Sequence, residues 1–386
     1  MRRASWQRFD VGLFLAMLML LGLGILLIYS AYDHAIYGDD APLSEYLSVK
    51  QAWRVGVGLV GYLVAVLLDY QLLFKARRLI YVGVLGVLLA TLFAGQTAFG
   101  AQRSIEIAGT AVQPSELVKV LMIAVLAQAL GQGQEHLETP VPFLMSLLLL
   151  APPAILVYQQ PDFGTTFVMV VTWVGMVFLA GVRWRHILIA AIVGVLAVPV
   201  IWFRLEDYMR DRVLDYLNPT GASPDESYNV RQALISIGNG GWWGAGLLQG
   251  SQSQLYFLRV RHTDFVFSVL AEELGFLGCM GFLLIYAFLI YRLLSIAQQA
   301  PDEGGRLLAS GTAVMLTVQA LVNLGANTNL LPVTGIPLPL VSYGGSAVMT
   351  TIVALGLVQS VAVRRQRAES DEITSLGPRG IQRSIS

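Results

Sequence analysis

The sequence predicts an all-α polytopic membrane protein with about ten transmembrane helices, both termini in the cytoplasm, and one large extracytoplasmic loop between spans seven and eight. Three observations predict this class. The chain of 386 residues is 55% apolar and only 13% charged, and its mean hydropathy of +0.64 is typical of integral membrane proteins. The apolar residues form runs long enough to cross a bilayer, and the lysines and arginines concentrate in alternate loops.

A spanning helix needs roughly 20 mostly apolar residues. Ten runs qualify, at 11–31, 53–68, 79–96, 115–130, 143–158, 163–180, 186–203, 265–294, 307–328 and 345–363. The second and fourth are short, so about nine or about eleven spans remain alternatives. The first run follows Arg2, Arg3 and Arg8, as in a signal peptide. It is too long for one and no small-residue cleavage pattern follows, so we interpret it as a retained span.

Basic residues in short loops accumulate on the cytoplasmic side of a membrane. Under a ten-span topology, the basic residues of the N-terminus, the second, sixth and eighth loops and the tail share one side; they are Arg2, Arg3, Arg8, Lys75, Arg77, Arg78, Arg183, Arg185, Arg292, Arg306, Arg364, Arg365 and Arg367. Both termini are therefore predicted to be cytoplasmic. The fourth loop, 131–142, has no lysine or arginine and gives no evidence for either side.

We interpret residues 1–368 as one integral-membrane domain and 369–386 as a polar cytoplasmic tail that we expect to be disordered. The connection 204–263 is too long for a simple link and is predicted to be extracytoplasmic. Residues 205–217 are charged and amphipathic, as in a helix that lies in the membrane interface. The glycine-rich stretch that ends at Gly250 is expected to allow close backbone approach. No Gly-Lys-Ser or Gly-Lys-Thr follows it, so it is not a phosphate loop.

In this topology the even-numbered spans enter from the outside, so their first residues should share the outer face. Those openings carry the unusual polar residues of the chain. They lie at 113–119, 160–165, 262–264 and 340–345, and span nine ends on the same face with Asn323, Asn327 and Asn329. The sequence therefore predicts a polar site at the outer leaflet.

Asp264 is the strongest candidate for a functional residue, because a carboxylate at membrane depth is costly and by default marks function. The alternative is an acid that only stabilises the helix start through the helix dipole. Arg261 and His262 beside it favour catalysis. Glu272 and Glu273 lie in the same span but point about 80° and 180° away from Asp264, so we expect them to be hydrogen-bonding partners inside the bundle.

Other polar residues have structural interpretations beside functional ones. Glu116 and Lys119 stand one helical turn apart and can pair, and the structural and functional roles are equally open there. Asp162 is expected to be an N-cap that also touches ligand. The single cysteine, Cys279, lies in an apolar run and is expected to fill the core. The remaining histidines make no metal-ligand spacing; they are His34, His136 and His186.

Ordered motifs along nearly the whole chain resemble the SEDS family, named for shape, elongation, division and sporulation. The motifs are Gly100-Ala101-Gln102-Arg103, Gln113-Pro114-Ser115-Glu116-Leu117-Val118-Lys119, Gln160-Pro161-Asp162-Phe163-Gly164-Thr165, Gln252-Ser253-Gln254, His262-Thr263-Asp264-Phe265-Val266-Phe267, Glu272-Glu273-Leu274-Gly275, and the run from Leu331 to Ser346. The Gln-Ser-Gln motif and the Gly-Ile-Pro-Leu-Pro-Leu form resemble the elongation branch, RodA, more than the division branch, FtsW. Ser104 and Arg259-Val260 depart from the family pattern, whereas Asp264 keeps it.

The resemblance implies a peptidoglycan glycosyltransferase that polymerises lipid II, the undecaprenyl-diphosphate-linked disaccharide peptide. It would act at the outer face of the bacterial cytoplasmic membrane during cell elongation, and so in maintaining cell shape. The family's key aspartate falls on Asp264, and its supporting pair falls on Glu116 and Lys119. The implied partner is a class B penicillin-binding protein; membrane lipids surround the chain and no nucleic acid is involved.

The chemistry can also be argued from the substrate class. A sugar on a polyprenyl diphosphate already has a good leaving group, so one base suffices. In our hypothesis Asp264 accepts the proton of the attacking hydroxyl, Lys119 with Arg103 or Arg261 stabilises the diphosphate, and Glu116 orients Lys119. Direct displacement inverts the anomeric centre, in contrast to the paired carboxylates of retaining glycosidases. The other candidate substrate-binding residues are Gln113, Asp162, His262, Thr263, Ser342 and Tyr343.

No cofactor is certain from the sequence. A divalent cation, Mg²⁺ or Mn²⁺, that bridges Asp264 and the diphosphate is compatible with this chemistry, although no ligand cluster in the sequence demonstrates one.

Other functions remain open. A flippase for the lipid-linked precursor needs polar access from both sides and typically has interrupted helices in repeated halves, whereas here the polar residues concentrate at the outer openings. A non-catalytic scaffold leaves the acidic and basic outer cluster unexplained. An FtsW-like polymerase specific for division is the third alternative.

Overall fold

Each of the ten predicted apolar runs forms a helix in the computed structural model. The structure describes residues 6–37, 42–94, 96–98, 101–107, 110–132, 139–204, 207–217, 224–255, 257–258 and 261–364. The ten helices are α1 (Val11–Ile28), α3 (Leu47–Leu67), α5 (Arg77–Ala94), α6 (Pro114–Gln132), α7 (Val141–Gln159), α8 (Phe163–Leu179), α9 (Trp184–Arg204), α13 (Val266–Gln298), α14 (Glu303–Asn327) and α15 (Gly345–Ala362). Their order along the chain matches the prediction.

Within the described residues, six helices are long and apolar enough to cross a membrane, judged by length and composition. They are Val11–His34, which continues α1, together with α6, α7, α13, α14 and α15. Helix α8 and the segment Trp184–Leu196 of α9 are apolar but shorter. The chain is therefore a multi-pass membrane protein, while the total of ten spans stays a prediction.

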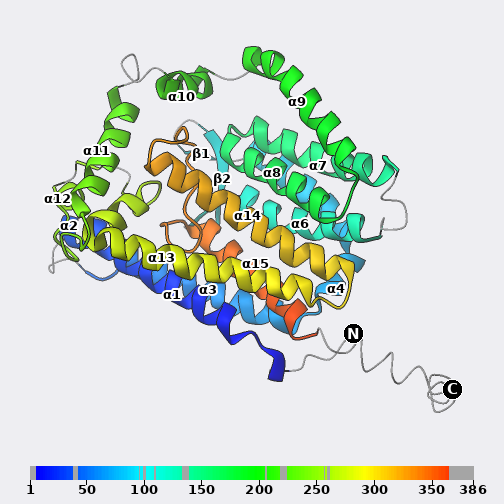
Figure 1. Cartoon of the computed structure of the whole chain (residues 1–386), viewed down its shortest axis with the longest axis horizontal. Helices are drawn as coiled ribbons and strands as arrows, with labels where there is room; N and C mark the ends of the chain where they lie inside the picture. Colours follow the sequence, from blue (N-terminus) through cyan, green and yellow to red (C-terminus); the bar gives the residue numbers. More distant parts are fainter. Residues whose placement is uncertain are drawn as a thin grey trace.

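Helices α13, α14 and α15 lie in the middle of the molecule, with α1 and α3 on one side and α6, α7 and α8 on the other (Figure 1). Helix α15 packs along α3, and α14 packs against α13, α6 and α8. The buried face of α14 includes small residues such as Ala309, Gly311 and Ala313, which let neighbouring backbones approach closely. Helix α14 therefore packs closely against α6, α8 and α13, which carry or follow candidate site residues.

The long connection between α9 and α13 contains three further helices, α10 (Asp207–Leu217), α11 (Pro224–Gly240) and α12 (Ser251–Gln254). Helices α9, α10 and α11 form an arc along the outside of the bundle (Figure 1). Helix α10 coincides with the amphipathic stretch predicted at 205–217. The connection is thus more than a simple link, and its extracytoplasmic location stays a prediction.

A small antiparallel sheet departs from the all-α prediction. Its strands, in the order β1-β2-β3, are β1 (Gln96–Ala98), β2 (Ala101–Ile107) and β3 (Thr110–Val112), and Ile105 of β2 is opposite Val112 of β3. Strand β2 contains the alternation Ile105-Glu106-Ile107, which suits a strand, but three short strands carry too weak a periodic signal to be predicted beside long apolar runs. The sheet leads the chain from α5 directly into the start of α6.

Short helical elements lie in the other connections between the long helices. They are η1 (Trp6–Arg8), the π-helix η2 (Tyr29–His34), α2 (Ala35–Tyr37) and α4 (Tyr70–Lys75). The π-helix continues α1 and carries Ser30, which donates a hydrogen bond to the carboxylate of Glu273 in α13. π-Helical turns are often found near functional sites, and this one lies beside the segment that precedes α13.

Contacts gather the segments predicted to be cytoplasmic at one end of the bundle. The joining pairs are Arg292 with Asp10 (Nε to Oδ1, 3.1 Å), Arg364 with Asp69 (3.8 Å), Gln71 with Asp302 (3.0 Å) and Arg306 with the carbonyl of Leu179 (2.9 Å). These pairs connect the start of α1, the end of α3, α4, the end of α8, the turn between α13 and α14, and the end of α15. The predicted grouping of these segments is confirmed, whereas their side of the membrane stays a prediction.

Helix α13 is interrupted at Gly275, where φ is 65° and ψ is −165°. The glycine-rich stretch 240–250 supplies hydrogen bonds across the interruption. The amides of Ala245 and Gly246 donate to the carbonyls of Glu272 and Glu273 (2.9 and 3.0 Å), and the amides of Phe276 and Leu277 donate to the carbonyls of Gly241 and Trp242 (2.9 and 3.2 Å). Backbone groups that a broken helix leaves open inside a bilayer need protein partners of this kind.

Two glycines are required at this contact because a side chain would collide with backbone. A Cβ atom at Gly244 would lie 2.1 Å from the carbonyl oxygen of Glu273, and one at Gly275 would lie 2.3 Å from the amide nitrogen of Gly244. Both residues also have positive φ angles, 81° and 65°, which favour glycine. The close backbone approach predicted for the glycine-rich stretch is confirmed.

The side chains of Glu272 and Glu273 are buried on either side of this contact. Glu272 accepts hydrogen bonds from the hydroxyl of Ser251 (3.1 Å) and the amide of Gln252 (2.8 Å), and Glu273 accepts one from Ser30. The prediction that both glutamates are hydrogen-bonding partners inside the bundle is confirmed. They fasten α12 and η2 to the first half of α13, next to Asp264.

Candidate functional site

Asp162 joins the starts of α6 and α8. It is the N-cap of α8, where its Oδ1 accepts a hydrogen bond from the amide of Thr165 (3.2 Å). Its Oδ2 accepts two more, from Nε2 of Gln113 (2.7 Å) and from the hydroxyl of Ser115 (2.9 Å). The N-cap role predicted for Asp162 is confirmed. The same carboxylate also fixes the first turn of α6, which carries the next two candidate residues.

Glu116 and Lys119 form an ion pair on α6, with Lys119 Nζ 2.8 Å from Glu116 Oε1 and side chains only 4% and 7% exposed. A buried ion pair holds its two charges in one geometry, and removal of either partner leaves an uncompensated charge. Lys119 also lines a small, mainly apolar cavity between α6, α8 and α14 that includes Thr172 and Met315. The pairing of Glu116 with Lys119 is confirmed, whereas the role of Glu116 in orienting Lys119 toward a ligand stays a prediction.

The segment before α13 is held by its backbone. The carbonyl oxygen of Asp264 accepts hydrogen bonds from the side-chain amides of Asn323 (3.0 Å) and Asn327 (2.8 Å), at the end of α14. The carbonyl of Thr263 accepts one from the hydroxyl of Ser342 (2.6 Å). Because these partners bind the main chain, they fix the position of residue 264 without using its carboxylate.

His262 and Tyr343 lie together where this segment meets the residues before α15. The amide of Tyr343 donates to the carbonyl of His262 (2.8 Å), and the rings are edge to face at 5.7 Å between centroids. Tyr32 of η2 packs on the other side of His262 at 4.8 Å. Arg54 of α3 stands over the Tyr343 ring at 4.8 Å, a cation–π distance.

Arg261 is almost fully buried beside this group, 2% exposed. Its guanidinium donates to the carbonyl of Ala31 within η2 and to the carbonyl of Leu258 (3.2 Å), and it lies over the ring of Tyr32 at 5.9 Å. Arg261 therefore ties the approach to Asp264 to the first helix. It contributes positive charge to this end of the bundle from a fixed position.

We expect the protein to lose thermal stability as the pH falls from about 6.5 to about 4. Burial, and then the adjacent Arg261 guanidinium, lower the pKa of His262 from 6.5 to about 4, against an opposing effect of Asp33. His262 is therefore neutral in the folded protein over this window, while the unfolded chain takes up a proton, so acid favours unfolding. Melting temperatures measured from neutral to acidic pH should show this slope, and His262→Asn should flatten it. An equal slope in the variant would contradict the assignment.

The structure brings most of the predicted site residues to one end of the bundle. Gln113, Asp162, Glu116 and Lys119 lie at the starts of α6 and α8, and Arg261, His262, Thr263, Asp264, Ser342 and Tyr343 lie before α13 and α15. Ser346 at the start of α15 joins the two groups, because its hydroxyl accepts a hydrogen bond from the amide of Gln113 (2.8 Å). Arg103 is in β2, and its side chain lies outside the described part of the structure.

Sequence reasoning missed Arg54, Gln51 and Tyr32. Gln51 of α3 donates to the carbonyl of Ser342 (3.3 Å), and Nη1 of Arg54 is buried without a hydrogen-bond partner in the described residues. The sequence did contain a signal for Arg54, because a cation near the start of an apolar span is unusual. Helix α3 begins at Leu47, six residues before the predicted span 53–68, so Arg54 lies inside the helix. Arg54 is half-buried and adds a third cation to Lys119 and Arg261.

The arrangement combines a half-buried carboxylate, Asp264, with cations on α3, α6 and the segment before α13. Among the residues that the structure describes, no group of three or more His, Cys, Asp and Glu side chains lies close enough to hold a metal ion. A carboxylate that can accept a proton, at the same end of the bundle as cations that can stabilise an anion, suits transfer of a group from a phosphate leaving group.

The family model FtsW/RodA/SpoVE, described as a cell cycle protein, matches residues 11–367. Peptidoglycan glycosyltransferase MrdB of Escherichia coli K12 is 40% identical over 259 residues, which cover 66% of this chain and 69% of MrdB. Stage V sporulation protein E of Bacillus subtilis is 32% identical over 364 residues, 92% and 96% of the two chains. A probable peptidoglycan glycosyltransferase FtsW of Geobacter sulfurreducens is 35% identical over 267 residues, 68% and 70% of the two chains.

Solved structures agree with this relationship. RodA of Thermus thermophilus superposes with a TM-score of 0.69 and 31% identity, over 94% of this chain and 99% of RodA. A chain of a peptidoglycan synthase complex, described as coordinating polymerization and crosslinking, superposes with a TM-score of 0.79 and 32% identity, over 94% of this chain and all of that chain.

Proposed function

The chain belongs to the FtsW, RodA and SpoVE family, the SEDS family, and we propose that it is a peptidoglycan glycosyltransferase that polymerises lipid II into glycan strands. Relatives named as peptidoglycan glycosyltransferases support the activity. The observation that carries it for this chain is the polar end of an apolar bundle, where Asp264 is positioned through its backbone by Asn323 and Asn327 and where the buried cations Lys119 and Arg261 also lie.

In the proposed mechanism Asp264 is the general base. A hydroxyl oxygen of the acceptor sugar attacks the anomeric carbon of the donor, and the bond from that carbon to the diphosphate oxygen breaks. The hydroxyl proton moves to the Asp264 carboxylate, and the polyprenyl diphosphate leaves as an anion. The displacement is direct, so the anomeric centre inverts and no covalent intermediate with the protein forms.

The diphosphate needs positive charge as it departs. Lys119, held by Glu116 at 2.8 Å, is the first candidate, with Arg261 and Arg103 as predicted from the sequence. The contacts of Arg54 add it to this group, because it stands over Tyr343 and has a buried nitrogen without a hydrogen-bond partner in the described residues. A phosphate oxygen would satisfy that nitrogen with a charge-assisted hydrogen bond.

We place the reaction at the outer face of the bacterial cytoplasmic membrane, as the distribution of basic residues predicts, and assign it to cell elongation on the RodA-like motifs. The proposed partner is a class B penicillin-binding protein. Support for a crosslinking partner comes from the similarity to a chain of a peptidoglycan synthase complex. A division role is the alternative, since relatives of both kinds are similar to this chain.

The test is polymerisation of lipid II by the purified full chain in detergent, with and without the penicillin-binding protein. We expect long glycan strands that a muramidase degrades. A flippase makes no such strands, so a chain that binds lipid II and never extends it, even with the partner present, would refute the proposal. The same assay with EDTA, Mg²⁺ or Mn²⁺ tests whether a divalent cation bridges Asp264 and the diphosphate.

A further inference from the structure

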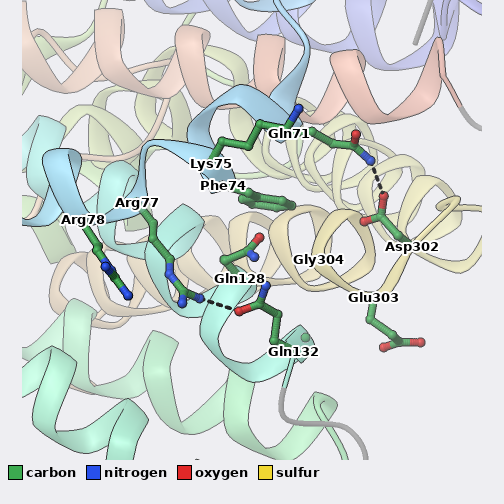
Figure 2. Close-up of a pocket in the computed structure, with 11 residues that line it drawn as sticks. Gln71, Phe74, Lys75, Arg77, Arg78, Gln128, Gln132, Asp302, Glu303 and Gly304 are labelled. Carbon is green, nitrogen blue, oxygen red and sulfur yellow. Dashed lines mark hydrogen bonds between the residues drawn. The ribbon is translucent and has the colours of Figure 1, made fainter. Parts of the chain in front are cut away.

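A cavity of about 660 Å³ lies at the end of the bundle opposite Asp264, between α4, α5, the end of α6 and the beginning of α14. Figure 2 shows the basic side chains of Lys75, Arg77 and Arg78 on one side of it and Asp302 with Glu303 on the other. The volume is within the range of small-molecule sites, about 300–1,000 Å³. The proposed polymerase reaction uses none of these residues.

The cations of this cavity lack acidic partners in the described part of the chain, whereas its acids are engaged. Arg77 donates to the amide oxygen of Gln132 (2.6 Å), and Lys75 and Arg78 are exposed. Asp302 accepts from the hydroxyl of Tyr70 (2.6 Å), from Gln71 (3.0 Å) and, as the N-cap of α14, from the amide of Gly305 (2.7 Å). Glu303 pairs with Arg306, with Nε 2.7 Å from Oε2.

The walls of the cavity are fixed by close packing. A Cβ atom at Gly131 would lie 3.1 Å from the amide nitrogen of Gly304, and one at Gly304 would lie 2.5 Å from the ring of Phe74. The end of α6, the start of α14 and the buried Phe74 are therefore in direct contact. These contacts form the floor of an open cavity, and the basic side chains of Lys75, Arg77 and Arg78 line it.

An exposed apolar stripe leads away from the basic side along α5. Leu79, Val82, Leu89 and Phe93 are 76%, 66%, 42% and 82% exposed, and their spacing of three, seven and four residues places them on one face of the helix. The stripe begins directly after Arg78. A ligand with a phosphate at Arg78 and a hydrocarbon chain along α5 would contact both the basic side chains and the apolar stripe. Free phosphate would contact only the basic side chains.

We propose that this cavity binds the phosphate headgroup of an anionic phospholipid, with the acyl chains along the apolar stripe of α5. Basic pockets between membrane helices bind such headgroups because each cation near the surface gains energy from the anionic charge. The cavity is therefore a lipid site separate from the polymerase site, and the proposal does not depend on the proposed function.

The experiment is a lipid titration of the purified full chain, read by native mass spectrometry and by thermal stabilisation. Phosphatidylglycerol is compared with phosphatidylcholine of the same acyl chains and with inorganic phosphate. The test variant is Lys75→Gln with Arg78→Gln, both at exposed positions. The matched control is Arg183→Gln with Arg185→Gln, an exposed basic pair just before α9 and in its first turn.

We expect the test variant to bind phosphatidylglycerol about tenfold or more weakly than the unchanged protein, from the loss of two cations. The control should keep the affinity, and phosphatidylcholine should bind more weakly than phosphatidylglycerol to the unchanged protein. Lipid-free melting temperatures verify that both variants fold. Equal losses in the two variants, or no preference for phosphatidylglycerol, would overturn the site. Stabilisation by inorganic phosphate but not by phosphatidylglycerol would overturn the lipid as its ligand.

Discussion

Asp264→Asn is expected to lower the rate of lipid II polymerisation by about 10²- to 10⁴-fold, the usual contribution of a general base. The asparagine side chain has nearly the same shape but cannot accept the hydroxyl proton. The variant keeps the backbone carbonyl of residue 264 that Asn323 and Asn327 bind, so we expect it to fold. The rate is measured as glycan strand formation by the purified chain with its partner protein.

The matched control is Glu45→Gln, the same chemical change at an exposed position outside the candidate site. It should retain the full rate. The melting temperatures of both variants should stay close to that of the unchanged protein, which separates lost chemistry from lost folding. If a folded Asp264→Asn protein made strands at the normal rate, Asp264 would not be the base.

Lys119→Met should destabilise the protein by about 3–5 kcal/mol, because it leaves the carboxylate of Glu116 buried without its partner. The two side chains are 4% and 7% exposed, so water cannot replace the lost ion pair. Adding Glu116→Gln should restore much of the stability, since the double variant has no buried charge. Denaturant unfolding in detergent measures both effects and their coupling.

The chain offers a comparison pair with the same spacing. Glu303 and Arg306 are also three residues apart, but their side chains are 45% and 33% exposed. Arg306→Met should cost only about 1–2 kcal/mol, from loss of this exposed pair and of the hydrogen bond to the Leu179 carbonyl. Activity gives a second readout. If Lys119 binds the diphosphate, the double variant will be stable yet slow. A double variant with restored stability and normal rate would assign the pair a structural role only.

Hydropathy was sufficient to predict the helices, because each spanning helix must present an apolar surface over its whole length. Because successive spans cross the membrane in opposite directions, the order of the spans was then sufficient to predict that Asp162, Asp264 and Ser342 lie at one end of the bundle. The N-cap role of Asp162 was also predictable, since it depends on residues within one turn. Its bonds to Gln113 and Ser115 were not, because they depend on how α6 and α8 pack.

The features that could not be predicted depend on contacts between distant segments. The interruption at Gly275 requires a specific stretch about thirty residues earlier, and nothing in the local sequence of α13 states which stretch provides its partners. Arg54 lies within the predicted span 53–68, but its place over the Tyr343 ring depends on how α3 packs against the residues before α15. The basic cavity requires α4, α5, α6 and α14 together. The basic residues of the loops predicted the positive charge of this cavity but not its shape.

The interruption of α13 also has a consequence for biosynthesis. The amide and carbonyl groups opened at Gly275 have their partners in residues 240–250, which leave the ribosome before α13 does. Residues 240–250, which supply these partners, are therefore synthesised before the interrupted helix enters the lipid. A circularly permuted chain that begins between these two segments would reverse the order of synthesis. Its α13 would have to enter the bilayer with unsatisfied peptide groups, so it should insert poorly even though it encodes every contact of the finished molecule.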